Sequence, residues 1–164
     1  MSAIPFIRTR PGARRSRLAV ACAGVCLSCA TLFSAPAAAQ VHQRAEGGYV
    51  VRSTAIASQS LPSDVAKAHG VAPAPGVGVL NVSVYRAKRP TYDPVAAEVQ
   101  ASATDLTGVR QQIPMKPARA QGDVSYYGTY RYLPNEPLDF TVTVRPQGSD
   151  HDVTLTYQEM LRQD

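Results

Sequence analysis

Residues 138–158 read LDFTVTVRPQGSDHDVTLTYQ and contain the strongest fold signal in the sequence. Two runs flank a polar turn, and every second position in each run is apolar. The apolar positions are Leu138, Phe140, Val142, Val144, Val153, Leu155 and Tyr157. Successive side chains of a β-strand point to opposite faces, so this alternation is typical of strands with one buried and one wet face. The stretch therefore predicts an antiparallel hairpin that joins residues 140–145 to residues 153–157.

The same alternation recurs upstream, in runs separated by Gly, Pro and Asn residues. The predicted strands cover residues 49–57, 80–84, 95–104 and 124–132, and Pro114 makes residues 109–115 a poorer candidate. These short strands predict a mostly β fold, an immunoglobulin-like antiparallel β-sandwich of about seven strands. The term immunoglobulin-like describes the architecture alone, because the sequence has no tryptophan and no cysteine after position 39.

One short helix fits the sequence between the first two predicted strands. It spans about residues 62–69, with Ser60 as its capping residue and Gly70 as the residue that ends it. Val65 and Ala66 would pack this helix against the sheets. We further predict a flexible tail over residues 40–47 and a single β-sandwich domain over residues 48–164.

The first 39 residues have the order of a secretory signal peptide. Five arginines and no acidic residue precede an apolar run at 18–33, and SAPAAA at 34–39 fits an A-x-A cleavage site. The apolar run is short for a membrane span. We therefore predict cleavage before Gln40 and export to the periplasm. The alternatives left open are a retained membrane anchor, the twin-arginine route for Arg14 and Arg15, and a protein lipid-anchored in the envelope.

The charge of the chain depends on this leader. The formal net charge is +5, but five of the 17 basic residues precede position 40, while all 12 acidic residues follow it. The predicted mature chain therefore has 12 basic and 12 acidic residues, and no net charge. Nucleic-acid binding has no electrostatic support in such a chain.

The sequence contains no recognisable catalytic, cofactor or metal-binding motif. Cys22, Cys26 and Cys29 all lie in the leader, so the mature chain has no disulfide and no thiol chemistry. The remaining histidines, at positions 42, 69 and 151, do not lie at a metal-ligand spacing, and the sequence has no GxSxG motif. We therefore predict no catalytic residue, no cofactor and no metal. A hydrolase site assembled only in three dimensions is the alternative.

Tyrosine is the one compositional feature that indicates a site. Tyr126, Tyr130 and Tyr132 would share one face of their strand with Gly128, and Tyr127 would point to the other face. We predict that the first three tyrosines belong to the core. Gly128 would leave room beside them for a neighbouring ring or a ligand. Tyr127, on the wet face, is the candidate for a surface contact.

Several short motifs resemble the domain of unknown function 4426, a family of small exported bacterial proteins. They are GYVV at 48–51, LP at 61–62, VAKA at 65–68, Gly70, LNVSV at 80–84, ATDLTG at 103–108, YY at 126–127 and FTVTVRP at 140–146. The match covers about residues 48–157. His69 and Asp105 depart from the Tyr and Asn that this family resemblance leads us to expect. The resemblance implies an exported, β-rich fold and transfers no catalytic residue.

Taken together, these features predict a monomeric, non-enzymatic binding or accessory module of the periplasm. Its partner would be an envelope protein, a peptide or a glycan, bound through a strand edge or a sheet face. The prediction rests on the fold class and on the absence of catalytic motifs.

Overall fold

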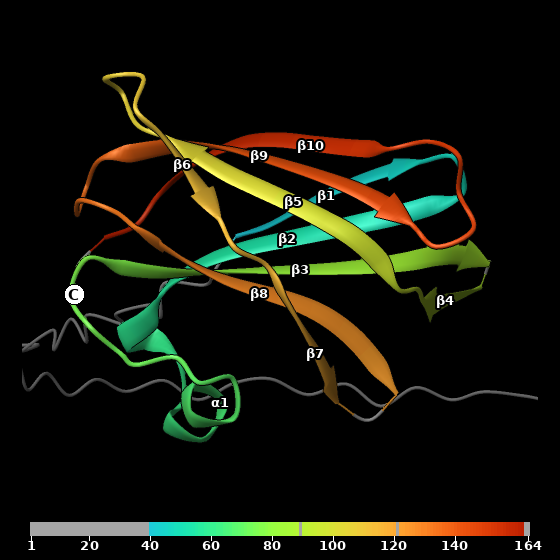
Figure 1. Cartoon of the computed structure of the whole chain (residues 1–164), viewed down its shortest axis with the longest axis horizontal. Helices are drawn as coiled ribbons and strands as arrows, with labels where there is room; N and C mark the ends of the chain where they lie inside the picture. The colour runs from blue at the N-terminus through green and yellow to red at the C-terminus, as the bar shows by residue number, and fades with distance from the viewer. Residues whose placement is uncertain (1–39, 89, 121, 163–164) are drawn as a thin grey trace, which may run out of the picture. The chain divides into compact units, whose positions relative to one another are not determined.

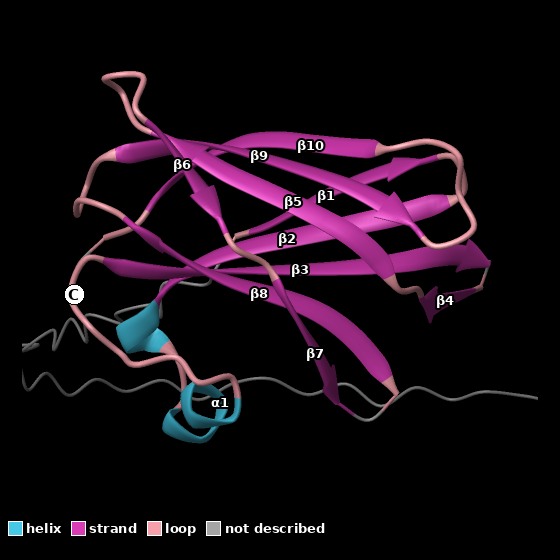
Figure 2. Ribbon diagram, in the orientation of Figure 1, coloured by secondary structure: helices cyan, strands magenta, loops and turns pink. Residues whose placement is uncertain are grey.

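The computed structural model describes residues 40–88, 90–120 and 122–162, and the predicted signal peptide lies outside these residues. The described chain forms two antiparallel sheets that pack face to face, as in a sandwich (Figure 1). None of the helices in the described part is long and apolar enough to cross a membrane. The fold is mostly β, as the alternating sequence predicts (Figure 2).

The larger sheet is built around the long strand β3 (Val77–Lys88). Its path runs β1 (Val41–Glu46), β2 (Tyr49–Ala57), β3, β8 (Asp123–Arg131) and β7 (Lys116–Ala120). One side of β3 has two partners in turn, because residues 77–83 pair with β8 and residues 85–88 pair with β4 (Thr91–Pro94). β8 therefore diverges from β3 at the end where β4 takes over the pairing.

The smaller sheet contains the hairpin that the sequence predicts. Its order is β10 (Val153–Met160), β9 (Pro137–Pro146), β5 (Ala97–Thr104) and β6 (Arg110–Ile113). β9 and β10 pair along their length, with Val144 opposite Val153 and Phe140 opposite Tyr157. The register puts the alternate apolar residues of both strands on one face, so the predicted hairpin is confirmed.

The core lies between the two sheets and takes its side chains from both. Leu80 and Val82 of β3 and Val142 and Val144 of β9 are fully buried in it. Tyr126 crosses this core from β8, and its hydroxyl accepts a hydrogen bond of 2.7 Å from the backbone N–H of Ala97, at the start of β5. The tyrosine thus ties the two sheets together through a polar contact.

Side chains also join the sheets along the border between β6 and β8. The side-chain amide of Gln111 donates to the backbone carbonyl of Arg131 at 2.6 Å, and its oxygen accepts from the backbone N–H of Arg131 at 2.9 Å. The amide of Gln111 therefore takes the place of a neighbouring strand for one residue of β8.

An excursion of the chain between β2 and β3 covers part of the outer face of the larger sheet (Figure 1). It contains a 3-10 turn, η1 (Ser58–Ser60), and the short helix α1 (Ser63–Ala68). Val79 points outward, because its neighbour Leu80 belongs to the core, yet it is only 1% exposed. The excursion buries this outward position, and Ala66 of α1 is buried with it.

Ser58 closes the excursion at its base. Its hydroxyl donates to the carbonyl of Ala74 at 3.1 Å and accepts from the N–H of Ala74 at 3.0 Å, and the serine is fully buried. We expect Ser58→Ala to lower the free energy of unfolding by about 1–3 kcal/mol, because it leaves the N–H of Ala74 unpaired and removes one of the two hydrogen bonds to the Ala74 carbonyl, which also accepts from the N–H of Val77. Urea denaturation measures this change, with the exposed Ser63 as control, since Ser63→Ala removes a hydroxyl that has no hydrogen-bond partner among the described residues. Equal stability of the two variants would contradict the closing role of Ser58.

The structure differs from the sequence prediction at three strands and at one cap. The described part has ten strands instead of about seven, because β1, β4 and β7 are short or largely exposed and lack a clear apolar alternation. The prediction of a flexible tail over residues 40–47 is wrong, because β1 pairs with β2 along its whole length. The short helix is confirmed, but Ser60 does not cap it and instead ends η1.

Candidate functional site

The end of α1 positions the first residue of the candidate site, His69. The N–H of Gly70 bonds to the carbonyl of Lys67 at 3.2 Å, and the N–H of Val71 bonds to that of Ala66 at 2.8 Å. This is the Schellman arrangement, in which the residue after the cap adopts a positive φ, here +63° at Gly70. Gly70 therefore ends the helix as predicted, and His69 is held as the C-terminal cap over the sheet.

Tyr127 lies on the outer face of β8, as the alternation predicts. Its ring stacks on the imidazole of His69, with centroids 4.1 Å apart and an angle of 25° between the rings. Lys116 of β7 pairs directly with Tyr127 in the ladder, so the two side chains share this face. The other three tyrosines of the run, Tyr126, Tyr130 and Tyr132, are buried in the core, which confirms their predicted side of the strand.

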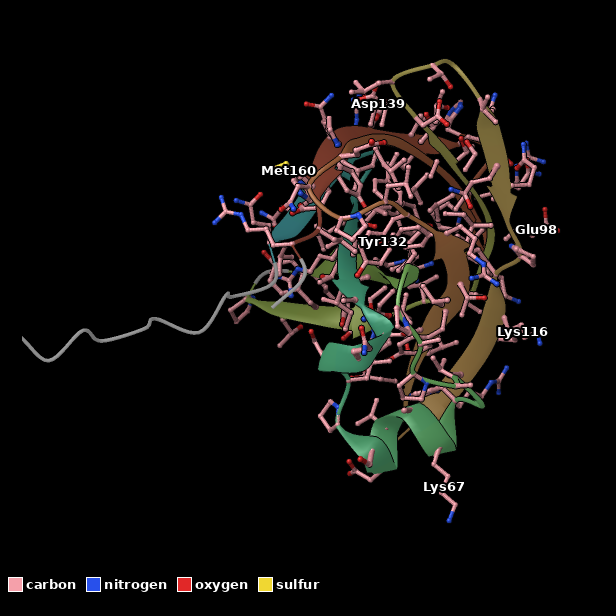
Figure 3. All side chains as sticks on the ribbon, turned by 90° about the vertical axis from the view of Figure 1, so that its left-hand side faces the viewer. Lys67, Glu98, Lys116, Tyr132, Asp139 and Met160 are labelled. Atoms are coloured by element: carbon pink, nitrogen blue, oxygen red, sulfur yellow. The ribbon has the colours of Figure 1, made fainter. Side chains whose placement is uncertain are left out.

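A groove of about 520 Å³ opens beside this stacked pair, between the end of α1 and the edge strand β7. Its described lining is Ala68, His69, Gly70, Val71, Pro114, Lys116, Pro117, Ala118, Arg119, Tyr127, Gly128 and Thr129. Figure 3 shows Lys116 projecting outward from the strands, whereas Tyr132 lies among the side chains between them. The groove brings together one predicted contact residue, Tyr127, and two residues for which the sequence predicts no contact, His69 and Lys116.

A second polar cluster lies inside the molecule, where β1 meets β10. The hydroxyls of Ser53 and Tyr157 are 2.7 Å apart, and His42 Nε2 lies 2.9 Å from a carboxylate oxygen of Glu159. The His42 ring also stacks on Tyr157 at 4.0 Å. His42 therefore joins the two sheets and does not belong to a tail. The sequence missed this cluster because 117 residues separate His42 from Glu159.

This inner cluster contains the residue types of a hydrolytic site, but its geometry does not suit one. Ser53 is fully buried and already shares its hydrogen bond with Tyr157. A nucleophile must be reachable by substrate and hydrogen-bonded to a general base. His42 instead faces Glu159 and the flat side of Tyr157. The arrangement packs and orients side chains at the border of the two sheets.

Burial perturbs the two phenols closest to this cluster. It raises the pKa of Tyr157 to about 12, and it raises the pKa of Tyr130 well above the ordinary value of a phenol. The Tyr130 hydroxyl is buried and has no hydrogen-bond partner among the described residues. Both groups are therefore uncharged at neutral pH and are not poised for acid–base catalysis.

These raised values predict a loss of stability in alkaline solution. The folded protein holds the phenolic protons more tightly than the unfolded chain, whose tyrosines ionise near pH 10. The raised phenol pKa values contribute fully to the free energy of unfolding below about pH 10, and this contribution decreases as the pH rises above that value. Urea denaturation at pH 8 and at pH 11 should show a smaller decrease for Tyr130→Phe than for the wild type. An identical decrease would contradict this assignment of Tyr130.

The described residues contain no group of three His, Cys, Asp or Glu side chains that could hold a metal ion. Asp152, which follows His151 in the sequence, is paired with Arg145 at 2.7 Å. His42 and Glu159 form a pair and not a set of metal ligands.

Comparisons with known proteins agree with this fold. Among curated proteins none matches the sequence. A DUF4426 family protein from Pseudomonas aeruginosa PAO1 is 25% identical, with a TM-score of 0.65, over 76% of this chain and 96% of that one. A copper-bound variant of FetP from uropathogenic Escherichia coli strain F11 is 11% identical, with a TM-score of 0.51, over 71% of this chain and 91% of FetP. FetP expressed in the periplasm of E. coli BL21(DE3) gives 11% identity and a TM-score of 0.50, over 74% of this chain and 95% of that one.

The likeness to FetP concerns the fold alone, and no copper site is carried over from it. The family model for the domain of unknown function DUF4426 matches residues 43–164, which include the groove and all of the two sheets except the first two residues of β1. The chain therefore belongs to the DUF4426 family.

Proposed function

We propose that this protein is a non-enzymatic binding module of the cell envelope and that it binds its partner on the outer face of the larger sheet, at Tyr127. The observation that carries the proposal is the stacked pair of Tyr127 and His69 beside an open groove. Aromatic side chains with one polar end are enriched at interfaces, where the ring provides contact area at low entropic cost. The helix cap and the sheet hold this pair in place before a partner arrives.

A small envelope hydrolase is the competing function. The inner cluster is the best candidate for catalysis in the described part of the chain, but Ser53 is buried and its hydroxyl is already hydrogen-bonded to the hydroxyl of Tyr157. The groove at Tyr127 contains no carboxylate among its described lining residues and no hydroxyl paired with a base. These two observations favour binding over hydrolysis.

The periplasmic location is part of the proposal. The order of the leader, with arginines, an apolar run and an A-x-A site, supports export by a cleaved signal peptide. The intact mass of the protein purified from the envelope tests it, since cleavage should leave a chain that begins at Gln40. A chain that retains residues 1–39 would rule out the cleaved signal peptide, and a lipid-modified cysteine would establish the anchored alternative.

Site-directed photocrosslinking in living cells tests the binding function. Benzoylphenylalanine is placed at Tyr127 and, as a matched control, at Thr156, which is exposed on the outer face of the smaller sheet. We expect one reproducible crosslinked partner from position 127 and none from position 156, followed by binding of that purified partner to the purified protein. Equal labelling at both positions, or no labelling, would contradict the proposed binding face.

Truncation of the same side chain separates binding from folding. Because Tyr127 is half-buried and mainly stacks on His69, we expect Tyr127→Ala to lower the free energy of unfolding by only about 1 kcal/mol. Loss of a central aromatic contact should weaken partner binding by at least about tenfold, the usual effect at an interface hot spot. Urea denaturation and titration calorimetry measure the two effects. His69→Tyr retains a ring to stack on Tyr127 and should retain binding.

A further inference from the structure

The chain after residue 39 has equal numbers of acidic and basic residues, whereas the groove beside Tyr127 is positively charged. Lys116 and Arg119 line it, and its described lining contains no aspartate or glutamate. Neither cation forms an ion pair within the described residues, whereas Arg44 and Arg145 each pair with a carboxylate. Both side chains are exposed, so their charges are available to a ligand.

We propose that the groove binds an extended peptide segment rich in aspartate and glutamate. The inference rests on the proposed binding function and names the class of its ligand. Lys116 shares the outer face of Tyr127, whereas Arg119, three residues along β7, points to the opposite face, where it also lines a hollow together with Glu98. Three residues of strand span about 10 Å, so an extended peptide that lies along the edge of β7 can place one carboxylate against each cation, on opposite faces of the strand.

The backbone of β7 adds a reason for an extended ligand. β7 is an edge strand that pairs with β8 on one side only. In an antiparallel ladder, alternate residues direct their backbone groups to the neighbouring strand. Pro117 has no N–H, and a proline is tolerated in a strand where the backbone groups of that residue point away from the neighbouring strand, here β8. The backbone groups of Arg119, two residues later, therefore also point away from β8, toward the open edge.

The proline also limits how a ligand can bind. Only Arg119 offers both an N–H and a carbonyl on the open side of this part of β7, and Pro117 offers a carbonyl alone. A long β-ladder of the kind that drives strand addition or aggregation is therefore blocked. One backbone pair at Arg119 can fix the direction of the peptide, while the cations and the Tyr127 ring provide selectivity.

Selection from a library of random hexapeptides tests the proposal on the purified protein. The binders are sequenced, and representatives are measured by fluorescence anisotropy at low and at high salt. We expect aspartate and glutamate to be enriched, and we expect affinity to decrease as salt screens the charges. The double variant Lys116→Glu/Arg119→Glu should lose at least tenfold in affinity for these peptides, whereas the control Lys88→Glu, at the far end of β3, should bind as the wild type does.

The outcomes separate this inference from the proposed function. Selected peptides that are neutral or basic, or acidic peptides that bind the double variant as well as the wild type, overturn the acidic-peptide assignment. In that case, photocrosslinking at Tyr127 still decides the binding function. If no peptide is selected, the assignment is also wrong, and a partner captured at Tyr127 would have to be recognised by other chemistry.

Discussion

Tyr130→Ala is expected to lower the free energy of unfolding by about 3–5 kcal/mol, the usual cost of removing a large buried aromatic side chain. Tyr130 is 4% exposed and lies edge-on to Phe140, with ring centroids 5.1 Å apart. Its ring also fills the space above Gly78, where an added Cβ would lie within 2.6 Å of the phenol. Truncation therefore leaves a cavity that Gly78, without a side chain, cannot fill.

Tyr127→Ala, three residues earlier, is the matched control, because it removes the same side chain from the opposite face of β8. Urea denaturation of the two variants compares the faces directly. A large loss of stability confined to Tyr127→Ala would mean that the strand faces the other way. Tyr130→Phe separates the ring from the hydroxyl, and it should be at least as stable as the wild type at neutral pH, because the hydroxyl has no partner.

Much of the fold could be predicted from the sequence, because burial on one face of a strand has a period of two. This pattern correctly assigned β2, β9 and β10 and correctly placed Tyr130 inside. It could not find β1, whose residues are mostly exposed on both faces. The position of β1 depends on backbone pairing with β2 and on the contact of His42 with Glu159, and neither leaves a local pattern.

The candidate site was predicted only in part, for the same reason. The alternation identified Tyr127 as the tyrosine on the outer face, but nothing near it in sequence indicates His69, which is 58 positions away and reaches it through the cap of α1. The family resemblance gave one useful signal, since it led us to expect a tyrosine at position 69. A ring of either kind can stack on Tyr127.

The other departure from the family resemblance, Asp105, also fits its place. Its side chain accepts hydrogen bonds from the backbone N–H groups of Thr107 and Val109, and the amide oxygen of an asparagine could accept them as well.

Gly128 lies on the predicted face of β8, but its neighbours differ from the prediction. The alternation predicts room beside the buried tyrosines for a ring or a ligand, but the chain itself fills this space where it passes from β6 to β7. A Cβ on Gly128 would meet Ile113 at 2.5 Å, Met115 at 2.7 Å and the backbone carbonyl of Pro114 at 2.9 Å. Pro114 therefore marks the point at which the chain changes sheets, and Gly128 is the position against which this crossing packs.

Gly128→Ala should accordingly lower the free energy of unfolding by about 3 kcal/mol, the upper part of the usual range for overpacking a core. The methyl group cannot be accommodated by side-chain movement alone, because one of its three close neighbours is backbone. The crossing would have to move, and it carries β7 and Lys116 with it, so binding at the groove should weaken in the same variant. Urea denaturation measures the first effect and peptide anisotropy the second. The exposed neighbour Thr129→Ala is the control for stability alone, because Thr129 lines the groove, and it is expected within about 0.5 kcal/mol of the wild type. If Gly128→Ala unfolds at the same urea concentration as that control, the crossing does not pack on β8, and the groove is not held in place by it.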